Sequence, residues 1–416
     1  MYPFPQNGPT VDPTLTHRRA RSVVTLTDAS GQPLRDVELT VGQRSHAFGF
    51  AATAFEFLPL VADELAGEEL EATQRVEELW FETFNWGTLP FYWGRFEPQR
   101  GNTDKERTMA TAKWLQERNV LVKGHPLVWH TVTAPWLDNL TVAEIEEAQR
   151  ARIRRDVADF CGVIDMWDAI NEVVIMPNFD KYPNGITRLC RELGRIETVR
   201  LAFDEARAAN PDATLLINDF DLSFGYDALL EGVLAAGVSI DAVGLQTHMH
   251  QGYRGEEQTI EIMDRFARYG LPLHFTETTL VSGDLMPEHI VDLNDWQVNS
   301  WPSTPEGEER QADELIRHVR TLFSHPSVKA FTYWNPWDRG AWLGAPAGLI
   351  NSDGSPKPSF EALRNLVRNE WWTGDRQVRT DEEGQFAIEG WKGTYAVLSG
   401  GSEAQFILGE DAVLSL

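Results

Sequence analysis

The segment IDMWDAINE (164–172) is a short, largely apolar run that ends in a carboxylate, Glu172. A second segment of this kind, LPLHFTE (271–277), ends in Glu277. Short apolar runs bounded by polar residues are typical of buried strands. We therefore expect each glutamate to emerge where a parallel strand gives way to a loop.

Further strand candidates alternate with amphipathic helical stretches along most of the chain. The helical stretches include residues 106–119, 198–210, 258–270 and 309–324. Eight strands separated by helical crossovers predict an α/β fold, a (β/α)8 TIM barrel, over residues 45–372. The predicted strands are 45–52, 84–89, 120–129, 164–171, 213–219, 241–248, 271–277 and 328–334.

The two flanks of the chain have a different pattern. Residues 18–44 alternate apolar and polar positions around the turn TDASGQP, which predicts a hairpin or strand pair, and residues 375–416 alternate in the same way. A Thr-Asp-x-x-Gly-Gln turn begins at Thr27 and again at Thr380. We expect a small β annex formed by residues 1–44, an N-terminal tail and strands, together with residues 373–416. A structural role is favoured over glycan binding.

Composition narrows the possible partners. The chain has 416 residues and a formal net charge of −26, which argues against nucleic acid and anionic membranes as partners. Fifteen tryptophans against eight tyrosines suit a cleft that binds sugars through exposed ring faces, although most will be core residues. Cys161 and Cys190 give no disulfide framework, and we expect no cofactor.

The sequence shows no membrane or export segment. No run approaches 18 apolar residues, and the N-terminus lacks the apolar core of a signal peptide. The chain is expected to be cytoplasmic or a mature secreted form, and the sequence does not decide between them. The oligomeric state is left open as well.

Polar and aromatic residues gather at the predicted carboxyl ends of the strands, where barrel enzymes carry their chemistry. Two carboxylates there suit glycoside hydrolysis, in which one acts as acid and the other as nucleophile or base. The strand-end residues are His125, Trp129, His130, Asn171, Glu172, Asn218, Gln246, His248, Glu277, Trp334 and Asp338.

Six motifs in fixed order carry a family resemblance. GHPLVWH (124–130), WDAINE (167–172), LINDF (216–220), GLQTHMH (244–250), FTET (275–278) and YWNPWD (333–338) with Trp342 resemble glycoside hydrolase family 10, known for endo-β-1,4-xylanases. The resemblance covers about residues 46–370. It implies retaining cleavage of a β-linked plant-type polysaccharide or oligosaccharide, the expected partner of this chain.

The resemblance also implies residue roles. Glu172 matches the acid/base and Glu277 the nucleophile of a double displacement. Asn171 matches the residue that bonds the sugar 2-hydroxyl. The other matches are substrate-binding residues: His125 and Trp129 in the same sugar site, Gln246 and His248 beside the nucleophile, and Trp334 and Trp342 above the sugar.

The chain departs from the family pattern on the glycone side. Tyr92 stands at a lysine position, and we expect it to line the substrate site. Val132 replaces a glutamine, and Thr279 replaces an aspartate two residues past the nucleophile. These changes predict a different, decorated or shorter glycan. The loop 281–305, which contains two tryptophans, is a candidate for new sugar platforms.

Two alternatives remain. His248 and His250 form an H-x-H motif, with His125 and His130 nearby in the predicted barrel, which suggests a metal site. Metal-dependent barrels usually carry this motif on the first strand, so a metal is disfavoured. The second alternative is a non-catalytic barrel that binds glycan.

Overall fold

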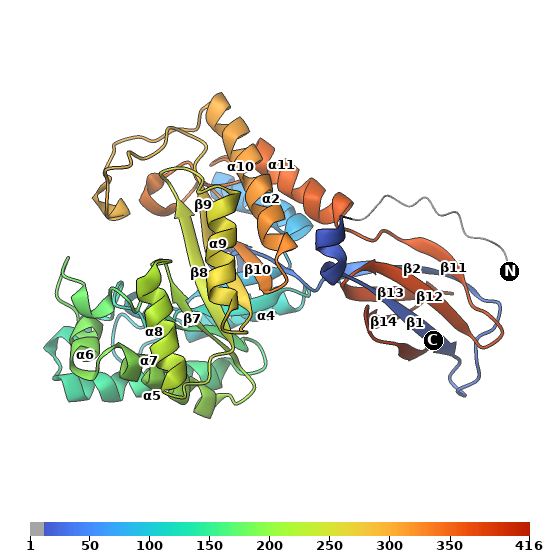
Figure 1. Cartoon of the computed structure of the whole chain (residues 1–416), viewed down its shortest axis with the longest axis horizontal. Coiled ribbons are helices and arrows are strands. Elements are labelled where there is room, and N and C mark those ends of the chain that lie inside the picture. The colour runs from blue at the N-terminus through green and yellow to red at the C-terminus, as the bar shows by residue number, and fades with distance from the viewer. Residues whose placement is uncertain (1–11) are drawn as a thin grey trace. The chain divides into compact units, whose positions relative to one another are not determined.

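The computed structural model describes residues 12–416, so residues 1–11 of the predicted tail lie outside the described residues. The chain divides into two compact units (Figure 1). The barrel unit comprises residues 50–319 and 327–363. Among the described residues, the annex unit comprises 12–49, 320–326 and 364–416.

Eight parallel strands close into a barrel in the order β10-β3-β4-β5-β6-β7-β8-β9, which confirms the predicted (β/α)8 fold. The predicted strand 45–52 is split between two elements, because β2 runs to His46 and the barrel strand begins at Gly49. The barrel strands are β3 (Gly49–Thr53), β4 (Trp86–Pro90), β5 (Leu121–His125), β6 (Met166–Asn171), β7 (Thr214–Asp219), β8 (Ala242–Met249), β9 (Leu273–Leu280) and β10 (Val328–Tyr333).

Helices occupy the connections between the strands. A capping box starts α5, since Thr141 Oγ1 accepts the Glu144 N–H and the Glu144 carboxylate accepts the Thr141 N–H. The α-helices are α1 (Phe57–Val61), α2 (Gly67–Thr83), α3 (Trp93–Phe96), α4 (Lys105–Gln116), α5 (Val142–Phe160), α6 (Gly185–Leu193), α7 (Arg195–Ala209), α8 (Phe224–Ala235), α9 (Glu256–Ala267), α10 (Pro305–Ser324) and α11 (Pro358–Asn365). Short 3₁₀ turns are η1 (Pro13–Arg18), η2 (Pro135–Asn139), η3 (Met176–Asn178), η4 (Leu293–Asp295) and η5 (Trp342–Gly344), and a π turn, η6 (Leu366–Glu370), follows α11.

The annex unit is formed by strands from both flanks, as predicted. A three-stranded sheet has the order β12-β1-β15, and a four-stranded sheet has the order β11-β2-β13-β14. Val24 and Leu26 of one sheet share a buried core with Leu39 and Val41 of the other. The strands are β1 (Arg19–Thr27), β2 (Glu38–His46), β11 (Arg376–Arg379), β12 (Gln385–Trp391), β13 (Gly393–Ser399), β14 (Ser402–Ile407) and β15 (Ala412–Ser415).

The predicted hairpin in residues 18–44 is wrong. β1 pairs with β12 and β15, whereas β2 pairs with β11 and β13. The Asp28 carboxylate accepts the N–H groups of Ser30 and Gln32, and beyond this turn the chain crosses to the other sheet. Alternation therefore identified the strands but not their partners. Within the described residues, no helix has both the length and the apolar composition needed to cross a bilayer.

Candidate active site

Glu172 follows the last residue of β6 at the carboxyl rim of the barrel. Its backbone has a φ of +56°, which is uncommon for a residue other than glycine, and its N–H donates to the Asn218 carbonyl at 2.8 Å. Such strained conformations cost roughly 1–3 kcal/mol and cluster at functional sites. The backbone thus holds the Glu172 side chain in a defined position at the rim.

Three donors surround the Glu172 carboxylate. Trp129 Nε1 donates to Oε2 at 2.8 Å, and Asn171 Nδ2 and Gln246 Nε2 lie 3.2 and 3.4 Å from Oε1. Burial raises the pKa of Glu172 to about 7, and the negative charge of Glu277 adds to the rise. A carboxyl of this kind keeps its proton close to neutral pH.

Glu277 lies near the end of β9 and is only 4% exposed. Asn218 Nδ2 donates to Oε1 at 3.0 Å, and His248 Nε2 lies 3.0 Å from Oε2. Burial raises the pKa of Glu277 to about 7, while His125, whose Nε2 lies 3.8 Å from Oε1, acts in the opposite direction. The charge of Glu277 is one cause of the raised pKa of Glu172, so ionisation of one of these carboxyl groups disfavours ionisation of the other.

Amide side chains link the two carboxylates. Asn218 Nδ2 donates both to Glu277 and to Asn171 Oδ1, the latter at 2.8 Å, and Gln246 Nε2 donates to the same Asn171 oxygen at 2.9 Å. A Cβ added to Gly244 would lie 2.4 Å from Asn218 Oδ1, so this glycine makes room for Asn218. Sequence reasoning placed Asn218 at a strand end but gave it no role.

A buried ionic group lies beneath the site. Asp168 Oδ2 contacts His125 Nδ1 and Lys123 Nζ, each at 2.7 Å. Burial alone would raise the pKa of Asp168, but Lys123 and His125 lower it overall. Ionised Asp168 therefore fixes the His125 ring with Nε2 toward Glu277. The sequence analysis did not identify Asp168, although it lies inside the motif WDAINE.

Aromatic rings form one wall of the site. The ring centroid of Tyr92 lies 5.7 Å from that of His125 and 5.4 Å from that of Trp129, and Phe55 contacts Tyr92 and Trp334 edge-on. Burial, then the charge of Glu277, raises the pKa of Tyr92 well above its usual range, so the phenol stays neutral. Tyr92, which was predicted to line the substrate site, thus offers an aromatic ring and a hydroxyl where the family pattern has a lysine cation.

Thr279, at the position where the family pattern has an aspartate, contacts two histidines. Thr279 Oγ1 lies 3.2 Å from His248 Nδ1 and 3.5 Å from His250 Nδ1. Burial lowers the pKa of both histidines to about 3, so both are neutral. The Trp342 ring packs against His248 and His250 at 5.0 and 5.2 Å.

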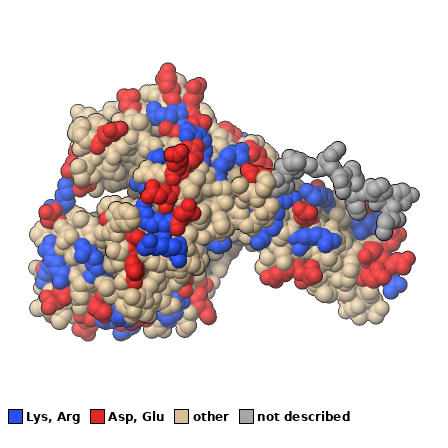
Figure 2. All heavy atoms as spheres, viewed as in Figure 1, with Lys and Arg blue, Asp and Glu red and all other residues tan. Residues whose placement is uncertain are grey.

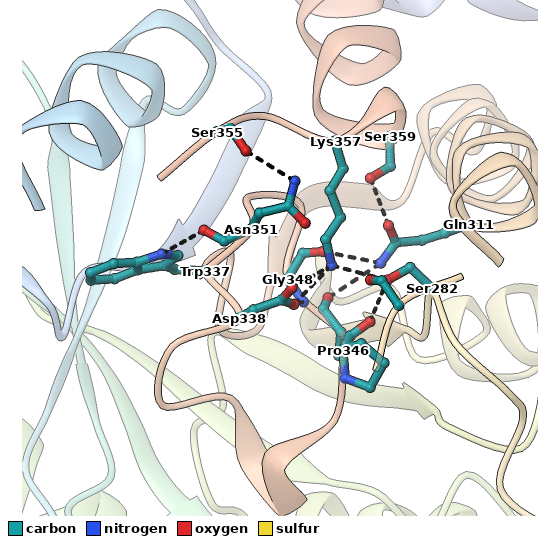
Figure 3. A network of polar contacts seen from close by, with 12 residues as sticks. Ser282, Gln311, Trp337, Asp338, Pro346, Gly348, Asn351, Ser355, Lys357 and Ser359 are labelled. Atoms are coloured by element: carbon teal, nitrogen blue, oxygen red, sulfur yellow. Dashed lines mark hydrogen bonds and ion pairs between the residues drawn. The ribbon is translucent and has the colours of Figure 1, made fainter. Parts of the chain in front are cut away.

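A buried polar network holds the loop that carries Trp342 (Figure 3). Lys357 is fully buried, and its Nζ contacts Asp338 Oδ2 at 2.7 Å and Ser282 Oγ at 2.9 Å. Gln311 Nε2 donates to the Leu280 carbonyl at 2.7 Å, and Figure 3 shows Ser359 bonded to its other amide atom. The network ties the loop after β10 to the loop after β9 and to α10.

Three exposed aromatic residues at the same rim escaped the sequence analysis. Tyr182 follows β6, and Phe220 and Phe224 follow β7, with exposures of 45%, 46% and 72%. Burial, and to a smaller degree the charge of Glu172, raises the pKa of Tyr182, and its ring packs edge-on against Phe179. The sequence held no signal that separates such rings from core aromatics.

Other predicted residues lie at the edges of the site. The His130 ring lies 4.6 Å from Phe179, and burial lowers its pKa to about 4. Val132 has a φ of +47°. Among residues 12–416, no group of three or more His, Cys, Asp or Glu side chains is arranged to hold a metal ion.

A (β/α)8 barrel whose rim carries two buried glutamates, linked through amide side chains, is an arrangement that glycoside hydrolases use. The model of glycosyl hydrolase family 10 matches residues 68–366. The chain belongs to this family.

Relatives agree with the family assignment. Endo-1,4-beta-xylanase B of Thermotoga neapolitana is 25% identical over 294 residues, 66% of this chain and 78% of that protein. The anti-sigma-I factor RsgI6 of Acetivibrio thermocellus is 26% identical over 389 residues, 91% of this chain but only 45% of that protein. The structure of xylanase 10B from Thermotoga petrophila RKU-1 with xylobiose has the same fold, with a TM-score of 0.63 and 21% identity over 78% of this chain and 95% of that one.

Proposed function

We propose that the chain is a retaining, endo-β-1,4-xylanase-like glycosidase that acts on a β-linked plant-type glycan, with Glu172 as acid/base and Glu277 as nucleophile. The coupling of the two carboxyl groups carries the proposal. The pKa values of Glu172 and Glu277 are both raised to about 7, and the charge of Glu277 is one cause of the rise at Glu172. A retaining mechanism needs an ionised nucleophile beside a protonated acid, and two coupled carboxyl groups that share one proton near neutral pH meet this need.

The chemistry follows in two steps. Glu277 attacks the anomeric carbon as the bond to the leaving oxygen breaks, and Glu172 passes its proton to that oxygen. The glycosyl ester on Glu277 is then cleaved by water, which gives its proton to Glu172. Two inversions at the same carbon return the original β configuration, and both residues recover their starting state.

Substrate recognition on the glycone side differs from the family pattern. A site that offers rings in place of a cation and amides loses hydrogen bonds to sugar hydroxyls, and a change of this kind alters selectivity. Tyr92, Phe55 and Trp334 favour stacking on a sugar face. We therefore propose that the ligand is a decorated or short β-linked glycan, or one with a different sugar.

Product release from a panel of β-linked plant polysaccharides and oligosaccharides tests the function, with Glu277→Ala as the blank. Cleavage that disappears in the blank and first gives the β-anomer by NMR supports a retaining hydrolase. An α-anomer as first product contradicts the mechanism. Azide that restores turnover of an activated aryl glycoside in Glu277→Ala with an α-azide product would identify Glu277 as nucleophile.

A second candidate function is glycan binding without turnover. It is favoured by one observation: the relative that matches 91% of this chain is named an anti-sigma-I factor rather than a hydrolase. Binding of panel glycans without product release at any pH between 4 and 9 would support it. Turnover that requires Glu277 would remove it.

A further inference from the structure

Two long loops at the carboxyl rim are joined by an ion pair. Lys181 Nζ, in the loop between β6 and α6, lies 2.8 Å from Asp295 Oδ1 and 3.2 Å from Asp292 Oδ2, both in the loop between β9 and α10. The first loop starts at Glu172, and the second starts at Val281, four residues beyond Glu277. The ion pair therefore connects two loops that leave the barrel beside Glu172 and Glu277.

Each loop is braced at its base. Arg191 Nε donates to the Pro177 carbonyl at 2.6 Å and Arg195 Nε to the Val174 carbonyl at 2.9 Å, which holds the first loop. Gln251 Nε2 donates to the Pro287 and Ile290 carbonyls at 2.9 and 2.8 Å, and Trp301 Nε1 donates to the Asp284 carbonyl at 2.8 Å. Two loops, each held by side-chain hydrogen bonds to its own backbone carbonyls, thus meet at the Lys181 ion pair.

The loops, the ion pair and the rim of β6, β7, β8 and β9 together form a closed ring. In the barrel order, β7 and β8 lie opposite β3 and β4, so the ring is on the side of the site away from Tyr92, which follows β4. Figure 2 shows an opening on the left of the barrel unit through which the background is visible. Figure 1 draws the loop after β9 above that opening and the loop between β6 and α6 below it.

We propose that this ion-paired strap closes one side of the cleft and makes the site selective for oligosaccharides and chain ends over the interior of a polymer. A glycan that contacts both carboxylates and extends away from Tyr92 must pass through the ring. A free end threads through it, whereas an internal segment enters only when the ion pair breaks. The inference rests on the proposed function and names its substrate class.

The ion pair of Lys181 with Asp292 and Asp295 is weak enough to break transiently. The side chains of Lys181, Asp292 and Asp295 are 47%, 35% and 61% exposed, so the pair is screened by salt. Exposed ion pairs shift an equilibrium by roughly 1.5- to 5-fold. The strap therefore biases access to the cleft rather than blocking it.

A carbodiimide, which joins an ammonium to a neighbouring carboxylate as an amide, tests the ion pair without any turnover. Peptide mapping is expected to find Lys181 joined to Asp295 or Asp292, with a lower yield in 1 M salt. Lys105 and Asp159, an exposed pair at 2.7 Å between α4 and α5, provide the internal control. A link at Lys105 with none at Lys181 would overturn the strap.

The consequence for substrates is tested by comparing turnover of soluble β-1,4-xylan with turnover of xylotetraose. Lys181→Glu is expected to raise the xylan-to-xylotetraose ratio about 2- to 5-fold. Adding Asp292→Lys and Asp295→Lys should restore the original ratio, and Lys105→Glu should leave it unchanged. An unchanged ratio in Lys181→Glu refutes the selectivity. If the carbodiimide joins Lys181 to an aspartate but neither glycan is turned over, the proposed xylan activity is wrong and the strap is still supported.

Discussion

Glu277→Gln should make the protein more stable at pH 8, at the cost of turnover. Glu277 is 4% exposed, and burial raises its pKa from 4.5 to about 7. The folded state then holds a proton that the unfolded chain has already lost, so stability falls as the pH rises from about 4.5 to 7 and is level above that. A shift of this size corresponds to about 3 kcal/mol.

The glutamine carries no charge, and its amide oxygen still accepts from Asn218. The barrel unit has about 300 residues, and an unfolding entropy of about 2 cal/mol/K per residue converts the gain to a melting temperature about 5 °C higher at pH 8. Removing the charge also lowers the pKa of Glu172, which adds to the gain. At pH 4.5 the difference from wild type should vanish.

Calorimetric melting of both proteins between pH 4.5 and 8.5 measures the difference. Glu97→Gln is the matched control, because Glu97 is 3% exposed but its pKa is lowered: burial acts to raise it, and the Gly101 N–H, Trp93 and Arg155 Nη1 at 2.9 Å more than offset this. Glu97→Gln should therefore lose stability, and more so at high pH. A Glu277→Gln variant that is less stable than wild type at pH 8, or whose difference is independent of pH, would refute the reasoning.

Three further results are expected. Initial rates measured from pH 4 to 9 should fall above about pH 7, because Glu172 then loses the proton that it must donate. Lys357→Met leaves Asp338 buried without its cation and should lower the free energy of unfolding by about 3–5 kcal/mol in urea titrations, with much of the loss recovered by adding Asp338→Leu. Tyr92→Ala should lower kcat/KM on xylotetraose roughly tenfold while Tyr92→Phe stays near wild type, since the ring face supplies the contact.

The barrel was predictable because its signals are local. Apolar runs and helical periods extend over short stretches of sequence, and motif order then places Glu172 directly after β6 and Glu277 on β9. The strand pairing in the annex was not predictable. The strands that carry Val24 and Leu39 show the same alternation of apolar and polar residues, although they belong to opposite sheets. Alternation records which face is buried and carries no information on the partner strand.

The residues of the candidate site also divide into those that the sequence predicted and those that it missed. Residues that touch the two carboxylates from strand ends, such as Gln246 and His248, were identified by position. Tyr182 and Lys181 lie in a loop, and their roles depend on where a distant segment of chain passes. A single exposed lysine has no local signature that separates it from the other surface cations.

The departures from the family pattern are consistent with one another in physical terms. Glu172, Glu277 and Asp168 already place three carboxyl groups in a small buried volume. A fourth carboxylate at position 279 would raise the pKa of Glu277 unless His248 became charged, and His248 is neutral. The neutral tautomer of His248 that directs Nε2–H at Glu277 leaves Nδ1 as an acceptor for the Thr279 hydroxyl, 3.2 Å away. The site thus keeps its reactive charge on the glutamates.

Under the proposed function, sugar recognition depends mainly on ring faces. On one side Tyr92 stands at a lysine position of the family and packs edge-on against Phe55, and rings recognise the shape of a sugar more than the pattern of its hydroxyl groups. On the other side the proposed strap through Lys181 disfavours entry of the interior of a polymer. A long polymer gains its affinity from many hydrogen-bonded subsites in a row, and neither side of this cleft favours that arrangement. Both features therefore favour short glycans, for which a few stacked contacts beside two well-oriented carboxylates suffice.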